Sequence, residues 1–154
     1  MKNLLLMLFA FSTFAVGCSR DNDDDHPQDL LQGSWKPAKT IVKYTVDSGT
    51  PQVTTENATS CEQQGRINIT DNANGNFTEF SENNGACTQT DAGTFTYSYD
   101  SNAKKITINE GGSSNTQDVN TLTSSSLVLS DTESFTMNGQ THTYVYEAHF
   151  EKVK

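Results

Sequence analysis

The stretch Leu31-Gln32-Gly33-Ser34-Trp35 decides how the rest of this sequence is interpreted, because a polar leader gives way there to a series of strand-like segments. It contains the only tryptophan of the 154-residue chain. After it, apolar and polar residues alternate with the period of two that is typical of half-buried β-strands. No segment shows the 3.6-residue apolar stripe of an amphipathic helix. The sequence therefore predicts that residues 30–154 form one all-β domain.

Aromatic and polar residues alternate in the two clearest strand segments, residues 94–99 and 144–150. This pattern places one set of side chains on a buried face. The aromatic candidates for lining the interior of the domain are Trp35, Phe95, Tyr97, Tyr99, Tyr144 and Tyr146. Trp35 is interpreted as a core plug at one end. For the others, simple filling of the interior is the alternative, and it is the commoner arrangement in small barrels.

Asn-Gly pairs predict hairpin turns, because a type I′ turn needs a positive φ at both central residues. They occur at residues 74–75 and 84–85, and a third pair at 138–139 precedes the last strand. Residues 47–65 are polar and are expected to form a loop or a weakly patterned hairpin. Pro37 marks an edge or a bulge in the strand that begins near Trp35.

Eight or nine short strands joined by short turns predict an antiparallel up-and-down meander. A meander of this size exposes unpaired edges unless it closes on itself. We therefore expect a roughly eight-stranded β-barrel, whose interior has room for side chains or for one small ligand. The apolar fraction of 33% agrees with sheets that have one wetted face, and it is low for a helical bundle.

Residues 1–17 have the features of a signal peptide. Lys2 gives a positive start, and residues 4–14 form an apolar run that is too short to span a bilayer. Small residues then precede Cys18, as in the lipobox of bacterial lipoproteins, although Ala15 stands where leucine is usual. The resemblance implies cleavage before Cys18 and a lipid on that cysteine. An ordinary signal peptide with an incidental cysteine is the alternative.

Residues 18–29 are expected to form a solvated tether, because the acidic run at 21–25 cannot bury apolar surface. An acidic patch directly after the cysteine is similar to the surface-export signal of Bacteroidetes lipoproteins. We therefore expect an outer-membrane lipoprotein that faces outward, with the periplasmic face as the alternative. The alternating aspartates of this run lack the turn glycine and the closing glutamate of a calcium loop, so no metal is expected.

The chain has three cysteines. With Cys18 assigned to the lipid, Cys61 and Cys87 remain as an even pair in an oxidising compartment. We expect a disulfide between them, which would close a loop of about 26 residues and contribute roughly 3 kcal/mol. Two free thiols are the alternative. No further ligand lies near either cysteine at the spacing of a zinc site.

From residue 30 to about residue 153 the chain resembles the lipocalin-like domain of Bacteroidetes lipoproteins. The opening Gly33-x-Trp35, the two later cysteines and the order of the strand motifs carry this resemblance. The strand motifs are Gly93-Thr94-Phe95-Thr96-Tyr97, Ile106-Thr107-Ile108, Leu122-Thr123 and Leu127-Val128-Leu129. The resemblance implies a lipocalin-like barrel. Typical lipocalins pack a late arginine over the opening tryptophan, whereas this chain has only Lys152 there, which is not equivalent to arginine in such a role.

Charge and motif content exclude several function classes. A net charge of −9 without a basic patch argues against binding of nucleic acid. The chain has no serine-hydrolase elbow, zinc-protease motif or phosphate loop, so neither an enzyme nor a cofactor is expected. His142 and His149 are separated by an odd number of residues, so they should point to opposite faces of one strand rather than form a ligand pair.

Two functions therefore remain open for the domain. In the first, a lipid-anchored barrel holds a small, partly hydrophobic ligand. In the second, the barrel is solid, and its loops or one face bind another envelope protein or a glycan. Interior volume distinguishes the two, because a cavity of several hundred cubic ångströms would favour the first.

Overall fold

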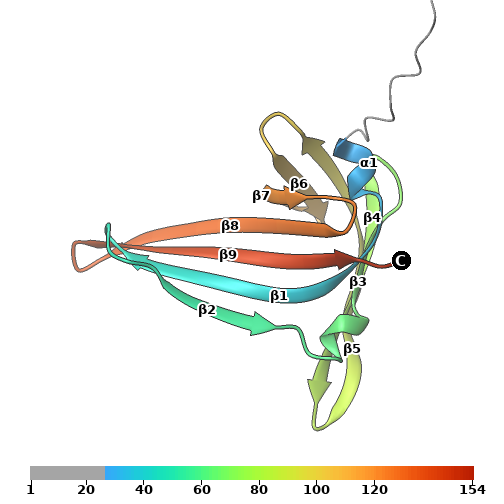
Figure 1. The fold of residues 1–154 in the computed structure, drawn as a ribbon, viewed down its shortest axis with the longest axis horizontal. Helices are drawn as coiled ribbons and strands as arrows, with labels where there is room; N and C mark the ends of the chain where they lie inside the picture. Colours follow the sequence, from blue (N-terminus) through green and yellow to red (C-terminus); the bar gives the residue numbers. More distant parts are fainter. Residues whose placement is uncertain (1–26) are drawn as a thin grey trace, which may run out of the picture.

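The structure, a computed structural model, describes residues 27–154 of the chain (Figure 1). The signal peptide, Cys18 and most of the acidic tether, all inferred from the sequence, lie outside the described residues. The elements are α1 (Pro27–Leu31), β1 (Gly33–Val46), β2 (Gln52–Asn57), the short 3-10 helix η1 (Glu62–Gln64), β3 (Arg66–Ile69), β4 (Asn74–Asn83), β5 (Ala86–Asp100), β6 (Lys105–Glu110), β7 (Ser113–Leu122), β8 (Ser126–Met137) and β9 (Gln140–Lys152). Between residues 27 and 154, no helix has the length and hydropathy needed to cross a membrane.

Eight of the nine strands close into an antiparallel barrel, which confirms the predicted fold class. Strand β1 is followed around the barrel by β3 to β9, and β9 pairs back with β1. The additional strand β2 forms a hairpin with β1 through Lys39–Tyr44, while β3 pairs with β1 through Gly33–Trp35. A register shift between Pro37 and Lys39 confirms the predicted bulge. For residues 47–65 the sequence left a loop or a hairpin open. The structure shows the hairpin, formed by β2 and β1, and a loop after it.

The barrel is closed at one end and splayed at the other. Strand β3 pairs with β4 only through Arg66–Ile69, and β7 pairs with β8 only as far as Ser130. Beyond these points β2, β1, β9 and β8 continue as a four-stranded sheet, residues 39–57 and 131–149, which we call the projecting sheet. Figure 1 shows it extending to the left, away from α1, while the β4–β5 hairpin projects separately toward the bottom.

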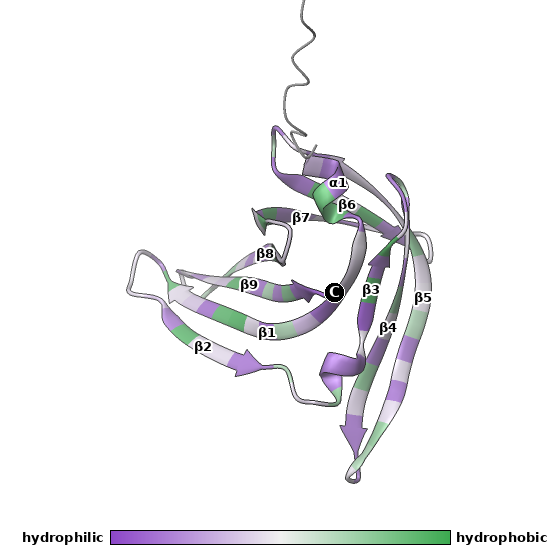
Figure 2. Ribbon diagram, turned by 45° about the vertical axis from the view of Figure 1, so that its right-hand side comes forward, coloured by the Kyte–Doolittle hydropathy of each residue, from purple (hydrophilic) through white to green (hydrophobic). Residues whose placement is uncertain are grey.

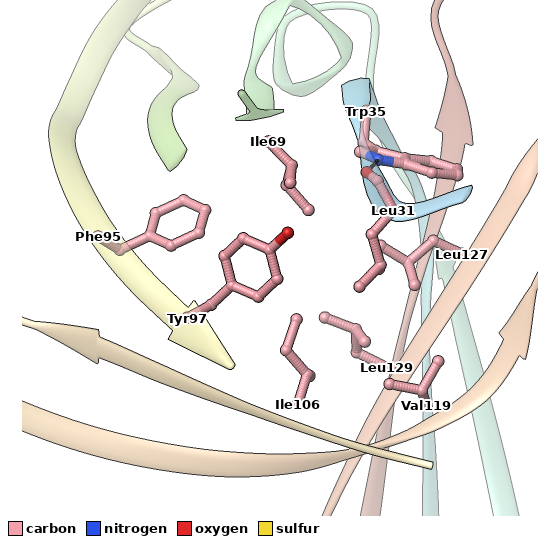
Figure 3. Close-up of a cluster of buried hydrophobic side chains, with 9 residues drawn as sticks. All are labelled: Leu31, Trp35, Ile69, Phe95, Tyr97, Ile106, Val119, Leu127 and Leu129. Atoms are coloured by element: carbon pink, nitrogen blue, oxygen red, sulfur yellow. Dashed lines mark hydrogen bonds between the residues drawn. The ribbon is translucent and has the colours of Figure 1, made fainter. Parts of the chain in front are cut away.

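The buried core lies at the closed end (Figure 3). Trp35 is fully buried there, and its indole Nε1 donates a hydrogen bond to the carbonyl oxygen of Leu31 at 2.8 Å. The core cluster consists of Leu31, Trp35, Ile69, Phe95, Tyr97, Ile106, Val119, Leu127 and Leu129. Complete burial of one such side chain contributes about 1.5–3 kcal/mol, so the closed end holds most of the packing energy of the domain.

Lys152 takes the position over Trp35 where the resemblance leads us to expect an arginine. Its Nζ lies 5.0 Å from the centre of the indole ring and donates a hydrogen bond to the carbonyl oxygen of Leu30 at 3.0 Å. A Cβ on Gly33 would lie 2.6 Å from the Cε of Lys152, so this glycine leaves room for the lysine stem. The lysine supplies the cation–π contact and one hydrogen bond, although it lacks the guanidinium fork.

One predicted turn was wrong. Asn74 and Gly75 belong to β4, and the chain turns before them, where the Asp71 carboxylate accepts hydrogen bonds from the N–H groups of Ala73 and Asn74 at 2.8 Å. The amide of Asn74 also donates to this carboxylate and lowers the pKa of Asp71. Gly75 is needed for packing instead, because a Cβ there would overlap the ring of Phe95.

The other two Asn-Gly pairs do form turns. Asn84 and Gly85 have φ angles of +51° and +77°, and Asn138 and Gly139 have φ angles of +53° and +78°. Positive φ at both central residues is the signature of a type I′ turn. These two turns lie at the tips of the β4–β5 hairpin and of the projecting sheet.

Lys43 and Glu147 form an ion pair on the outer face of β1 and β9, with Nζ and Oε1 2.5 Å apart. The hydrogen bond from Lys43 lowers the pKa of Glu147. A lowered carboxyl pKa stabilises the fold above the unfolded-state pKa, and this contribution is lost as the pH falls through the folded-state pKa.

We expect Lys43→Met to lower the free energy of unfolding by about 0.5–1 kcal/mol at neutral pH. The difference from the parent should disappear in acid, well below the ordinary glutamate pKa of about 4.3, because Glu147 is then protonated in both proteins. Urea unfolding at the two pH values measures this. A difference of the same size in acid would show that the lysine acts through packing rather than charge.

Candidate functional site

A cleft of about 740 Å³ opens at the splayed end of the barrel. It lies between β1, β2 and β9 on one side and β3, β4, β5 and β6 on the other, two groups that Figure 2 shows facing each other. Its apolar lining includes six side chains, Ile67, Phe77, Phe95, Ile108, Ala148 and Phe150, along with Pro37, Ala58 and Phe80. Five of these six side chains belong to the core cluster or pack directly against it, so the cleft lies next to the buried core.

Strand register explains why apolar residues line the cleft. Ile67 pairs with Phe77, and Phe77 pairs with Gly93, so these residues share the inner face of three adjacent strands. A Cβ on Gly93 would lie 2.7 Å from the ring of Phe77, so the glycine gives the ring its place. The space persists because β2 and β4 do not pair with each other, and no strand fills the opening between them.

A loop of residues 58–65 spans the split between β2 and β3 and forms part of the cleft wall. Thr59 and Glu62 cap its 3-10 turn reciprocally: the Thr59 N–H donates to the Glu62 carboxylate at 2.7 Å, and the Glu62 N–H donates to the Thr59 hydroxyl at 3.2 Å. The disulfide between Cys61 and Cys87 ties this loop to the start of β5, with Cα atoms 5.4 Å apart. The predicted cysteine pair is thus confirmed.

The aromatic residues singled out in the sequence fall into two groups. Trp35, Phe95 and Tyr97 are buried at the closed end, and Phe95 also lines the cleft. The hydroxyl of Tyr97 donates to the backbone carbonyl of Asp71 at 2.7 Å, and burial raises the pKa of this tyrosine. Tyr99 packs against the cluster from its edge. The remaining two candidates lie elsewhere.

Tyr144 and Tyr146 lie on the projecting sheet, on the face that continues the barrel interior. There they join an aromatic strip that consists of Tyr44, Phe135, His142, Tyr144 and Tyr146. The ring centres of Tyr44 and Tyr144 are 4.7 Å apart, and the Tyr44 hydroxyl lies 2.6 Å from Nδ1 of His142. Phe135 is 49% exposed, so part of this strip faces solvent.

Several cleft residues were not among the predicted interior-lining residues, namely Phe77, Ile108, Phe150 and the carboxylates Glu79, Asp91 and Glu110. Asp91, Gly93 and Phe95 are each two residues apart, so they share one face of their strand. The sequence alone could therefore have placed Asp91 on the same inner face as Phe95. His142 and His149 lie on opposite faces of β9, as expected. Within residues 27–154, no group of three or more histidine, cysteine, aspartate or glutamate side chains is arranged to hold a metal ion.

Comparison with known proteins adds two findings. The sequence model of one protein family, the lipocalin-like domain, matches residues 31–129 of the chain. Among solved structures, japanin from Rhipicephalus appendiculatus bound to cholesterol is similar, with 9% sequence identity, coverage of 73% of this chain and 75% of that chain, and a TM-score of 0.37. No curated protein matches the sequence.

Proposed function

We propose that this chain, which belongs to the lipocalin-like domain family, binds a small, partly apolar molecule in the cleft at the splayed end of its barrel. The observation that carries the proposal is the cleft itself. Ligand sites are typically concave, of roughly 300–1,000 Å³, with mostly apolar walls and a few polar groups. The cleft of about 740 Å³ has an apolar floor next to the core and charged residues toward its rim.

The packing of the barrel supports this function over that of a solid accessory domain. The core cluster seals one end, while the inner faces of β4, β5 and β6 continue past it into open space. Removal of water from the exposed parts of Phe77 and Phe150, which are only partly buried, would favour an apolar ligand by roughly 25 cal/mol for each Å² of apolar surface buried.

A neutral fluorescent probe, N-phenyl-1-naphthylamine, tests the proposal. We expect saturable binding to the parent and at least tenfold weaker binding to Ala148→Trp, because Ala148 lines the cleft and the larger ring would occupy it. Val145→Trp is the matched control, since Val145 lies on the opposite face of the same strand. Thermal unfolding verifies that both variants fold. Absence of saturable binding to the parent, or equal affinity for both variants, would contradict the proposal.

The aromatic strip favours a second candidate function, binding of a glycan on the projecting sheet. Exposed rings of Phe135 and Tyr146 offer apolar surface against which sugar rings could pack, and Glu133 lies between them as a hydrogen-bond acceptor. Affinity electrophoresis in gels that contain dextran, pullulan or xylan tests this idea. Retardation of the parent, but not of Tyr144→Ala, is expected if the strip binds glycans; equal mobility in every gel removes the candidate.

We also propose that a lipid on Cys18 anchors the domain to the bacterial outer membrane. Cys18→Ala should move the protein from the membrane fraction to the soluble fraction without a change in melting temperature, because the described domain begins nine residues later, at Pro27. A variant that still fractionates with membranes would contradict the anchor. Protease treatment of intact cells then distinguishes an outward-facing domain, which is cleaved, from a periplasmic one.

A further inference from the structure

We propose that the cleft selects ligands that carry a positive charge beside their apolar body. This inference rests on the proposed function, because it assumes that the cleft is a binding site. It concerns the chemical class of the ligand: an organic cation, such as an amine or a quaternary ammonium compound with an apolar tail. The argument comes from how charged side chains are distributed over the two faces of the strands that form the cleft.

Four carboxylates lie on the inner face at the mouth of the cleft. Glu79 is two residues beyond Phe77 on β4, and it pairs with Asp91 on β5. Glu110 is two residues beyond Ile108 on β6, so it points to the same side. Residues two apart on a strand share a face. The same alternation places Glu56 of β2 inward, because its partner Thr40 pairs with Ala148. All four carboxylates line the cleft.

None of these carboxylates has a cationic partner in the described part of the chain. The ion pairs between residues 27 and 154 involve Glu147, Glu151 and Asp118 instead. Glu79 and Asp91 are directly opposite each other on neighbouring strands. Like charges in that arrangement repel each other and are destabilising. A bound cation would relieve this repulsion, whereas an anion would add to it.

Two strongly basic residues, Lys39 and Arg66, also line the cleft. Lys39 pairs with His149, which follows Ala148 on β9. Because neighbouring residues of a strand point to opposite faces and Ala148 faces inward, Lys39 lies at an outward-facing position. The guanidinium of Arg66 donates from Nη1 to the carbonyl oxygens of Gln63 and Gly65, at 2.6 Å and 2.5 Å. Its hydrogen bonds are therefore directed into the loop of residues 58–65. The cleft lining carries five carboxylates against these two cations, so its net charge is negative.

A carboxylate, that of Glu110, and an aromatic ring, that of Phe77, both lie close to Gly93 in the wall of the cleft. The position that a Cβ on Gly93 would take is 2.7 Å from the Phe77 ring and 3.1 Å from Oε1 of Glu110. The carboxylate thus lies beside the ring on the inner side of this glycine. An ammonium group near both would gain from charge attraction and from the negative face of the ring. A single carboxylate and a ring suffice for such a contact, and a metal site would need more ligands.

Three probes with the same tail and different head groups test the inference by isothermal titration calorimetry below their micelle concentrations. These are decyltrimethylammonium, 1-decanol and decyl sulfate. We expect the cation to bind at least tenfold more tightly than the sulfate, with the alcohol between them. The preference should weaken as salt concentration rises, because ions screen the interaction.

Paired variants assign the effect to the cleft rather than to the overall charge of the protein. Glu79→Gln combined with Glu110→Gln should reduce the preference for the cation to less than threefold, while affinity for decanol is retained. Asp131→Asn combined with Glu82→Gln removes the same charge elsewhere on the domain and should keep the full preference, since neither residue lines the cleft. Thermal unfolding confirms that each variant folds.

The outcomes separate this inference from the proposed function. If no probe binds the parent, the proposed function fails and the inference fails with it. If decanol and decyl sulfate bind as well as the cation, the cleft binds ligands but charge selection is wrong. If the preference survives in the Glu79 and Glu110 double variant, the assignment to these carboxylates is overturned.

Discussion

Trp35→Ala is expected to lower the free energy of unfolding by about 4 kcal/mol. The side chain is fully buried, so truncation removes apolar contacts on all sides and leaves a cavity at the closed end. The Leu31 carbonyl oxygen also loses the hydrogen bond from the indole, and Lys152 loses the ring under its ammonium group. Unfolding in urea, followed by circular dichroism, measures the effect.

Two further variants keep this expectation testable if Trp35→Ala does not fold. Trp35→Phe retains much of the volume and should cost roughly half as much, since the cavity is smaller. Phe135→Ala removes an aromatic side chain that is 49% exposed, and surface truncations of this kind cost about 1 kcal/mol or less. A cost for Phe135→Ala equal to that of Trp35→Ala would mean that the core is not concentrated at the closed end.

Loss of the Cys61–Cys87 disulfide should lower the free energy of unfolding by about 3 kcal/mol, as chain-entropy estimates give for a loop of this length. The cysteines are 26 residues apart in the sequence, and the bond joins the loop of residues 58–65 to the start of β5. We expect Cys61→Ser to unfold at the same urea concentration with or without dithiothreitol. The parent should match the variant only when the reductant is present.

The disulfide also bears on the cleft, because it fixes the loop that forms part of the cleft wall. Binding of N-phenyl-1-naphthylamine to Cys61→Ser should therefore be weaker than to the parent, even in dilute urea where both are folded. If Cys61→Ser is less stable than the parent by the same amount with and without dithiothreitol, then the serine itself, rather than the missing bond, is destabilising.

The closed barrel could be predicted because local alternation identifies strands, and an up-and-down meander of this many strands must close to pair its edges. Alternation also placed Phe95 and Tyr97 inside. It assigned Tyr144 and Tyr146 to the same role, since a half-buried strand has the same period inside a barrel and beyond it. Which half of a long strand lies in the barrel depends on where its neighbour stops pairing, and that is a long-range property.

The same limitation explains what the sequence did not show about the cleft. It exists because β3 begins only at Arg66, so that β1 pairs with β3 through Gly33–Trp35 and with β2 from Lys39 onward, and this change of partner has no local signal. Asn74-Gly75 illustrates the opposite case: a strong turn signal was overridden because Asp71 offers a competing turn, and the ring of Phe95 requires a glycine beside it. Lys152 is separated from Trp35 by most of the chain, so only the fold brings them together.

The concentration of buried side chains at one end has a consequence for hydrogen exchange. Amide protons near Trp35, Ile69 and Leu127 should exchange last, through global opening alone, because every route to solvent disrupts the core cluster. Protons of β2, whose residues are all exposed and whose outer edge is unpaired, should exchange first, by local fraying. A ligand in the cleft would then slow the core protons by a factor of 1 + [L]/Kd, because it binds only the folded state. Protons that exchange by fraying that leaves the ligand bound would change little.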